Sequence, residues 1–259
     1  MNNQDIMCIA MQQSAYDCNC NANDFVKQEN IVKESVPNDK ARRYLELPLI
    51  CDLVSYGTNI VACGWTDLLP EIKRVIHSMP AIENCFETPG LYALNSVLKK
   101  VNAEICFMAD YFLPDIDAVY TKEFSTKYEI KVLEPNDFTF LYRKEWKNAL
   151  CAYRKHLDIL AVGAYEEEKL VGLAGCSADC DMMWQIGVDV LPEYRQQGIA
   201  SVLTNRLARE IFERDKVPFY CAAWSNVKSV RNAITSGFRP GWVEVTAKSI
   251  EFVDKMMKQ

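Results

Sequence analysis

The segment from Gly187 to Ala200 carries the residues whose types and spacing point most clearly to chemistry. It reads Gly-Val-Asp-Val-Leu-Pro-Glu-Tyr-Arg-Gln-Gln-Gly-Ile-Ala, which predicts a strand end, a tight turn at Gly198 and the start of a helix. The first N–H groups of a helix lack intrahelical partners, and the helix dipole adds partial positive charge to them. Because glycine lets a ligand approach the backbone closely, this segment predicts an anion site built from main-chain N–H groups.

The residue pattern of the turn excludes two common phosphate-binding motifs. Arg195, Gly198 and Ala200 give the pattern Arg-x-x-Gly-x-Ala. This pattern lacks the three glycines of the dinucleotide fingerprint and the Gly-Lys-Ser/Thr ending of the nucleotide triphosphate loop. The turn therefore belongs to neither of those two nucleotide-binding motifs.

A second motif follows one predicted strand further along the chain. Asn226 and Ser229 form Asn-x-x-Ser at the start of a predicted helix, and Gly237-Phe238 ends that helix. Together the two motifs resemble the signatures of the GNAT superfamily of N-acetyltransferases. That family carries Arg/Gln-x-x-Gly-x-Gly/Ala in its coenzyme A pyrophosphate loop, and then Asn-x-x-Ala/Ser with a later Gly-Phe. The resemblance covers roughly residues 127–248, half of the chain.

The resemblance implies a set of residues around coenzyme A. Strand-end residues would pair through their backbone with the pantetheine arm, the turn would hold the pyrophosphate, and the second motif would line the coenzyme on its other side. The residues implied are Val188, Asp189, Val190, Arg195, Gln196, Gln197, Gly198, Ile199, Ala200, Ser201, Asn226 and Ser229.

Several of these residues also have ordinary structural explanations. Val188 and Val190 are typical of any buried strand, and Gly198 can simply permit close packing of the helix on the strand. Asn226 is a good helix N-cap, a role that is compatible with ligand binding because the cap leaves its amide at the helix mouth. For Ser229, ligand contact and simple space filling remain equally open.

The catalytic residues are not identified by the pattern. Many GNAT members use a tyrosine seven residues after the motif asparagine as general acid, and here that position is Ala233. Candidate replacements for this acid are Tyr194 and Ser225, with Tyr220 and Tyr165 also close to the cleft in sequence, and Asp189 is a further candidate functional residue. Asp189 should point away from its neighbouring valines, and could bind an amine or simply be solvated. Backbone N–H groups near Val188 can stabilise the oxyanion without any special side chain.

The second half of the chain supplies elements that can position these motifs. Its periodicity predicts a mixed α/β sheet with strands and helices in the order of the GNAT fold. The expected elements are strand 128–133, a helix from 136 with its apolar side at Phe138, Leu141, Trp146 and Leu150, hairpin strands 157–165 and 170–177, strand 182–190, helix 199–212, strand 217–224, helix 226–236 and strand 238–246, interrupted at Pro240-Gly241.

The first half has no chemical motif. It predicts a helix at 7–16, two strands within 49–63, a helix at 65–79, a helix after Pro89-Gly90 and a strand at 103–109. A weak, charged stretch places the boundary near Ser125, giving an N-terminal α/β domain of residues 1–125 and a coenzyme-binding domain of residues 126–259. The first domain resembles, faintly, the region that precedes this domain in bacterial GNAT-like proteins. It could be a degenerate GNAT unit that shapes the acceptor site or forms a homodimer surface.

Composition restricts the partners and the compartment. The net charge of -6 and the pI near 5.2 argue against nucleic acid and acidic membrane surfaces. No apolar run reaches membrane-spanning length. Eleven cysteines, an odd number, and no leader-like N-terminus favour the reducing cytoplasm. The only close pairs, Cys18-x-Cys20 and Cys176-x3-Cys180, do not have zinc-finger spacing, so we expect no metal.

These observations lead to one expected function and one alternative. We expect a cytoplasmic, bacterial, acetyl-CoA-dependent N-acetyltransferase that moves the acetyl group directly from the thioester to an amine. The alternative, motivated by Ala233, is a coenzyme A-binding sensor or scaffold with lost or weak turnover. A small amine, an aminoglycoside, a peptide N-terminus and a lysine all remain open as acceptor, and so does the length of the acyl chain.

Overall fold

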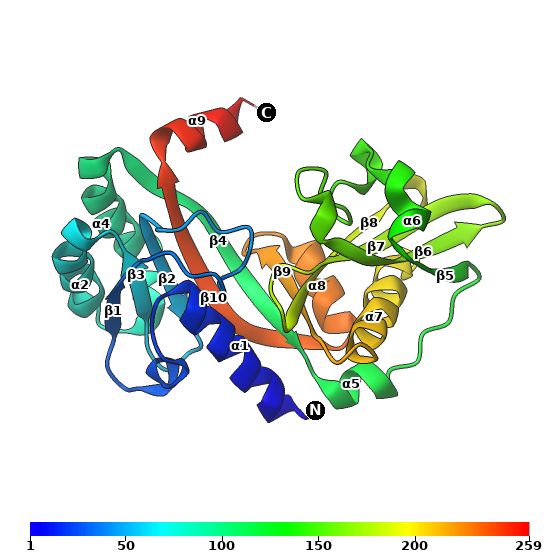
Figure 1. The fold of residues 1–259 in the computed structure, drawn as a ribbon, viewed down its shortest axis with the longest axis horizontal. Coiled ribbons are helices and arrows are strands. Elements are labelled where there is room, and N and C mark those ends of the chain that lie inside the picture. Colours follow the sequence, from blue (N-terminus) through cyan, green and yellow to red (C-terminus); the bar gives the residue numbers. More distant parts are fainter. Residues whose placement is uncertain (259) are drawn as a thin grey trace. The chain divides into compact units, whose positions relative to one another are not determined.

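The computed structural model describes residues 1–258 and divides into two compact units (Figure 1). Unit 1 comprises Met1–Ile9 and Tyr111–Pro240, and unit 2 comprises Ala10–Asp110 and Gly241–Gln259. The chain thus passes between the units three times, in helix α1 (Asn3–Asp17) and in strands β4 (Ala103–Pro114) and β10 (Phe238–Ser249). The domain limits 1–125 and 126–259 stay a prediction, and the compact units fall at different positions because these three elements contribute to both.

Unit 1 contains a mixed sheet in which neighbouring strands follow the order β9-β8-β7-β6-β5. The strand pairs β5/β6, β6/β7 and β7/β8 are antiparallel, whereas β8 and β9 are parallel. Its strands are β5 (Glu129–Leu133), β6 (Asp158–Glu166), β7 (Lys169–Ser177), β8 (Met183–Val190) and β9 (Val217–Ala223). Its helices are α5 (Ile116–Thr121), α6 (Pro135–Phe138), α7 (Ile199–Phe212) and α8 (Val227–Thr235). These ranges confirm the expected strands and the helices after both motifs.

Helix α7 provides the main cover of this sheet (Figure 1). Its residues Leu203, Leu207 and Ile211 are fully buried in one cluster with sheet residues that include Val162 and Val171. Apolar residues at i, i+4 and i+8 form a single stripe on a helix, so this spacing turns one face of α7 toward the sheet. The helix that follows the glycine turn is therefore fixed rigidly by the hydrophobic core.

The helix expected from residue 136 to residue 150 is wrong. Only α6 and two short 3-10 turns at Thr139–Leu141 and Lys144–Trp146 form there. Two carboxylates of the sheet accept hydrogen bonds from backbone N–H groups of the segment that follows. Asp189 accepts from residues 148 and 149, and Asp158 accepts from residue 151. Side-chain acceptors that bond the backbone offer it an alternative to the helix. The expected interruption at Pro240-Gly241 is also wrong, because β10 runs through both residues.

Unit 2 contains further paired strands, together with helices. Strand β3 (Val61–Gly64) lies between β1 (Ile31–Glu34) and β2 (Cys51–Ser55), and β2 pairs antiparallel with Val243–Thr246 of β10. Helices α2 (Leu69–Ser78), α3 (Ile82–Cys85) and α4 (Thr88–Leu98) contribute to its core, and α9 (Ile250–Met257) follows β10. The expected helices and strands of the first half are confirmed, with β4 extending five residues beyond the expected end at 109.

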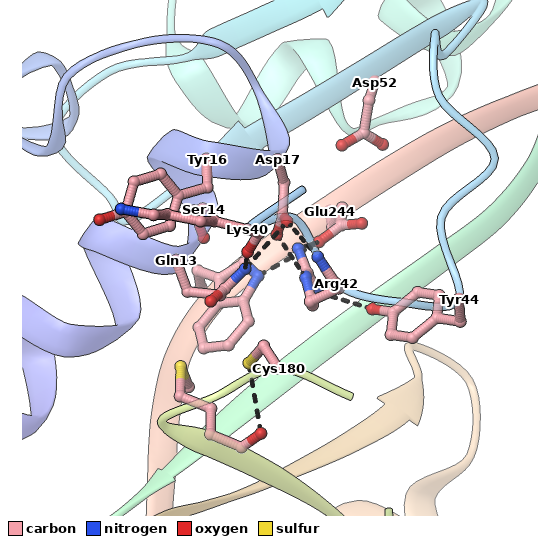
Figure 2. Close-up of polar contacts among 12 residues, drawn as sticks. Gln13, Ser14, Tyr16, Asp17, Lys40, Arg42, Tyr44, Asp52, Cys180 and Glu244 are labelled. Atoms are coloured by element: carbon pink, nitrogen blue, oxygen red, sulfur yellow. Dashed lines mark hydrogen bonds and ion pairs between the residues drawn. The ribbon is translucent and has the colours of Figure 1, made fainter. Parts of the chain in front are cut away.

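A buried charge network centred on Arg42 lies inside unit 2 (Figure 2). The Arg42 side chain, only 2% exposed, pairs with Asp17 of α1 at 2.5 Å and with Glu244 of β10 at 3.1 Å. Asp52 of β2 lies nearby and accepts a hydrogen bond from the Thr246 hydroxyl at 2.7 Å. Burial raises the pKa of Asp17 and raises that of Asp52 well above the usual value, with the charge of Glu244 adding to the second shift. The single positive charge of Arg42 therefore pairs with two of three buried carboxyl groups, those of Asp17 and Glu244.

Two further findings concern membrane-spanning helices and the state of the cysteines. Within residues 1–258, none of the helices combines the length and the apolar character that crossing a membrane requires. All eleven cysteines are free thiols, and six of them are buried, as expected where cysteine acts as a small hydrophobic residue. The six are Cys18, Cys51, Cys63, Cys85, Cys176 and Cys180.

Candidate functional site

The parallel strands β8 and β9 separate before they end. Their register runs from Met183 opposite Val217 to Ile186 opposite Tyr220, and no later pair joins them. Strand β8 nevertheless continues to Val190 and β9 to Ala223. On its other side β8 stays paired with β7 as far as Val190. Over its last four residues, the edge of β8 that faces β9 therefore carries backbone groups without a partner strand, and an extended ligand can bond them.

This separation opens into a cleft of about 610 Å³ between the end of β8, the glycine turn and α8. We call it the β8–α8 cleft. The cleft brings together most of the residues predicted from the sequence: Val188, Asp189, Val190, Tyr194, Arg195, Gln196, Gly198, Ile199, Ala200, Ser201, Asn226 and Ser229. Two motifs that lie about thirty residues apart in the chain thus form one site. The assignment of these residues to a ligand stays a prediction.

Three residues named from the sequence do not line the cleft: Gln197, Ser225 and Tyr165, which belongs to β6. The side chain of Gln197 points to Tyr128, whose hydroxyl donates to Gln197 Oε1 at 2.6 Å. Ser225 is an exposed turn residue between β9 and α8. Gln197 could still contribute its backbone N–H, which is the group that the anion-site argument requires.

The cleft also contains residues that the sequence reasoning missed. Lys228, Arg231, Asn232 and Thr235 line it from α8. They follow the spacing i, i+3, i+4 and i+7, so helical periodicity could have found them once Asn226 and Ser229 were assigned to the same helix. Asn148 also lines the cleft, and no local sequence signal indicates this because tertiary hydrogen bonds bring it there.

The glycine turn has the geometry of an anion site. Gly198 is the N-cap of α7 with φ of 77°, and a Cβ placed on it would meet no atom within 4 Å. Such a positive φ suits glycine and strains other residues. The N–H groups of Ser201 and Val202 are bonded to the Gly198 carbonyl, which leaves those of Ile199 and Ala200 at the open end of the helix. The turn therefore presents bare backbone donors to open space.

Positive charge surrounds this turn. The Arg195 Nε donates to the carbonyl of Val190 at 3.0 Å, which holds the guanidinium beside the end of β8. Lys228 and Arg231 add two exposed cations from the facing side of the cleft. The chain as a whole is acidic, so this local gathering of three cations with a helix N-terminus favours an anionic ligand here.

Asp189 has a structural partner that the sequence did not reveal. Its Oδ2 accepts the backbone N–H groups of Asn148 and Ala149 at 2.7 and 2.9 Å, and its Oδ1 accepts the Asn148 side-chain amide at 2.6 Å. The loop lies directly on β8, because a Cβ at Gly187 would be 1.9 Å from the Asn148 carbonyl oxygen. The sequence left amine binding and simple solvation open for Asp189, and the structure gives its carboxylate a third role, which is to fix one wall of the cleft.

Tyr194, Asn226 and Ala233 are the other positions singled out in the sequence, and each has a different environment. The Tyr194 hydroxyl donates to Glu166 Oε2 at 2.8 Å at an exposed rim, and this hydrogen bond raises the Tyr194 pKa. The Asn226 side chain accepts the Ser229 N–H at 3.2 Å, which confirms its role as N-cap of α8. Ala233 is fully buried on α8 and has no polar group to offer.

One cluster elsewhere has the residue types of a metal site. Cys18, Asp52 and Cys63 of unit 2 are buried, and one potential ligand atom from each lies within 4.8 Å of the others. The two thiols share a hydrogen bond, and Asp52 accepts from Thr246. These groups therefore have protein partners of their own. The sequence could not indicate this cluster because its members are far apart in the chain.

Comparison with known families identifies the part of the chain that forms the cleft. Residues 121–238 match the model of the acetyltransferase (GNAT) family. This segment is a GNAT acetyltransferase domain. It contains every residue that lines the β8–α8 cleft, and the match supports acyl transfer as the general activity. No curated protein matches the chain.

Solved structures of similar fold include several acetyltransferases. A GCN5-related N-acetyltransferase from Kribbella flavida aligns with 17% identity and a TM-score of 0.47, covering 61% of this chain and 63% of that one. A GCN5-related N-acetyltransferase-like protein from Streptococcus suis 89/1591 has 15% identity and a TM-score of 0.45, with coverage of 62% and 68%. An aminoglycoside N-acetyltransferase in complex with CoA has 16% identity and a TM-score of 0.36, with coverage of 46% and 91%. The chain spans about two thirds of the length of the first two structures.

Proposed function

We propose that the GNAT domain binds acetyl-CoA in the β8–α8 cleft and transfers the acetyl group directly to an amine. The observation that carries this proposal is the separation of β8 and β9 after Ile186 and Tyr220, which opens onto the Gly198 turn within one cleft. An extended ligand with amide groups and a phosphorylated end fits such a site. The strand edge offers hydrogen bonds to the amides, and the turn offers donors to the phosphates.

Different residues of the cleft would bind different parts of the coenzyme. The backbone groups of Val188 and the N–H of Val190 would pair with the pantetheine amides, as the edge of a sheet pairs with an added strand, whereas the Val190 carbonyl already accepts from Arg195. Backbone N–H groups from Gly198 to Ala200 would bond the pyrophosphate, and Arg195 would add charge beside it. The thioester would then lie at the opposite end of the open stretch, toward Ile186 and Tyr220.

The cleft also supplies a means of promoting the reaction. The amine nitrogen attacks the thioester carbonyl, a C–N bond forms, and the C–S bond breaks to release the thiol. A backbone N–H at the strand edge near Val188 can donate to the carbonyl oxygen as it gains negative charge. One such donor is worth roughly two to three powers of ten in rate. This contribution requires no particular side chain, so it is unaffected by Ala233.

A coenzyme A-binding sensor is the second candidate, favoured by the fully buried Ala233 at the position where the family carries its acid. The two candidates differ in turnover. Acetyl-CoA would be incubated with the protein and a panel of a polyamine, an aminoglycoside, a lysine peptide and a peptide with a free α-amine, and free CoA measured by chromatography. Release of CoA together with an acetylated amine supports the transferase, and coenzyme binding without product supports the sensor.

The binding site itself is tested with Gly198→Glu. A side chain at this position would project into open space at the mouth of the turn, so a glutamate places a carboxylate where the pyrophosphate is proposed to bind. We expect calorimetric titration with CoA to show no binding to this variant, while the wild type binds.

Gly57→Glu is the matched control. Gly57 has φ of 97° and also has open space around it, but it lies in unit 2. Both substitutions force a charged residue into a left-handed conformation, at a cost of about 1–2 kcal/mol each. The control should therefore lose similar stability and keep its CoA affinity. Equal affinity in both variants would show that the Gly198 turn does not hold the phosphates.

A further inference from the structure

Tyr220 occupies the narrow end of the β8–α8 cleft. It forms the last pair between β9 and β8, opposite Ile186, so the strands diverge directly beyond it. It lines the cleft although its side chain is only 4% exposed. The glycine turn lies at the other end, beyond Val190, and four residues of strand separate the two ends by about 13 Å. A coenzyme whose phosphates are held at the turn therefore directs its thioester toward Tyr220.

The hydroxyl of Tyr220 is held in a fixed place. Its Oη lies 2.8 Å from the Ser229 Oγ on α8, and Ser229 lines the cleft as well. Asn232, one helical turn further on, donates to Thr204 and accepts from Ser201, which ties α8 to α7. The phenol thus points from β9 toward the α8 wall of the cleft, the wall that also contains Ala233.

Tyr220 and Tyr194 are the two tyrosines that line the cleft, and only Tyr220 suits proton donation at the reacting end. The Tyr194 hydroxyl is committed to Glu166 at the exposed rim next to the glycine turn. Burial raises the pKa of Tyr220, so its phenol stays protonated at neutral pH. A hydroxyl at this point can replace the one that Ala233 cannot provide.

We propose that Tyr220 is the general acid of the reaction, supplying the proton of the departing thiol from β9 in place of a tyrosine on α8. This inference rests on the proposed acetyl transfer. The amine nitrogen forms its bond to the acetyl carbon and loses one proton to water. As the C–S bond breaks, the sulfur takes the electron pair of that bond and the phenolic proton of Tyr220. The phenolate recovers a proton through the Ser229 hydroxyl, which is replenished by water in the cleft.

The test is Tyr220→Phe, assayed with acetyl-CoA and whichever amine of the panel the wild type acetylates. We expect kcat to fall at least about a hundredfold, because general acid–base groups contribute two to four powers of ten. The affinity for CoA should be unchanged, since the hydroxyl acts on the leaving sulfur and not in binding. CoA and product are measured by chromatography, because accessible thiols of the protein such as Cys8 would react with thiol reagents.

Tyr153→Phe is the control, because it removes the same hydroxyl from a residue that is 95% exposed and lies outside the cleft. It should leave kcat unchanged. Should kcat of Tyr220→Phe also be unchanged, the acid is another group, although acetyl transfer itself stands. A parallel loss of CoA affinity would mean that Tyr220 only shapes the cleft. If the wild type releases CoA with no amine, the proposed function and this inference both fail.

A second measurement avoids any dependence on the folding of the variant. Difluorotyrosine at position 220 keeps the ring and the hydroxyl but lowers the phenol pKa. In a plot of kcat against pH, the decrease at high pH, where the acid loses its proton, should then move to lower pH. A decrease that stays at the wild-type position contradicts proton donation by Tyr220.

Discussion

Removal of the Asp189 carboxylate should release the loop at residues 148–149 from β8. Asp189 accepts three hydrogen bonds there, two from backbone N–H groups and one from the Asn148 amide. Hydrogen bonds to a charged acceptor are worth about 1.5–3 kcal/mol each when buried. Because this site is only half-buried, water can replace part of that energy, and we expect Asp189→Ala to lose about 3 kcal/mol of unfolding free energy.

Asp189→Asn distinguishes this positioning role from direct binding of an amine substrate. An amide has one acceptor oxygen, so its NH2 group would face a backbone N–H or the Asn148 amide instead of accepting from it. The asparagine variant should therefore be nearly as unstable as the alanine variant. A loss of 3 kcal/mol corresponds to a decrease in Tm of about 6–12 °C for a chain of this size.

Thermal unfolding followed by circular dichroism measures these changes. Asp254→Asn is the control, because it removes the same charge from an exposed position on α9. If Asp189 instead bound an amine substrate directly, Asp189→Asn would keep wild-type stability and raise the KM for the acceptor. That result would refute the role of Asp189 as the clamp of the 148–149 loop.

Two further predictions concern buried charges. Burial raises the pKa of Asp158 from 3.8 to about 6, so the stability it contributes is complete below pH 4 and is lost as the pH rises through 6. Urea unfolding across this range should therefore show wild type losing stability relative to Asp158→Asn, and parallel curves would contradict the shift. Arg42→Met should cost about 3–5 kcal/mol, because it leaves Asp17 and Glu244 buried without their cation. The exposed Arg74→Met should change stability by less than about 1 kcal/mol, and equal losses in both variants would contradict the network in Figure 2.

The sequence predicts those parts of the cleft that depend on local backbone rules. The turn at Gly198 requires a positive φ, and Asn226 caps α8, so the residue types themselves indicate the conformation. The strands and helices on either side follow from their periodicity. Local signals of this kind predicted the β8 side and the α8 side of the cleft and the helix N-terminus, but not the loop at residues 148–149.

The parts that the sequence could not predict depend on distant partners. The segment after α6 looks helical, yet Asp189, forty residues away, bonds its backbone N–H groups. The Arg42 network joins residues 25 and 202 positions apart, which no periodicity reveals. Tyr220 was one of several nearby hydroxyls in the sequence, and only the strand register shows that it stands at the apex of the cleft.

The most direct test of the central claim is the calorimetric titration of CoA into wild type, Gly198→Glu and Gly57→Glu. The cleft, its backbone donors and its cations predict saturable binding of one CoA per chain to wild type and to Gly57→Glu. They predict no binding to Gly198→Glu. Absence of binding to the wild type, or equal binding to all three proteins, would contradict a coenzyme site at the β8–α8 cleft.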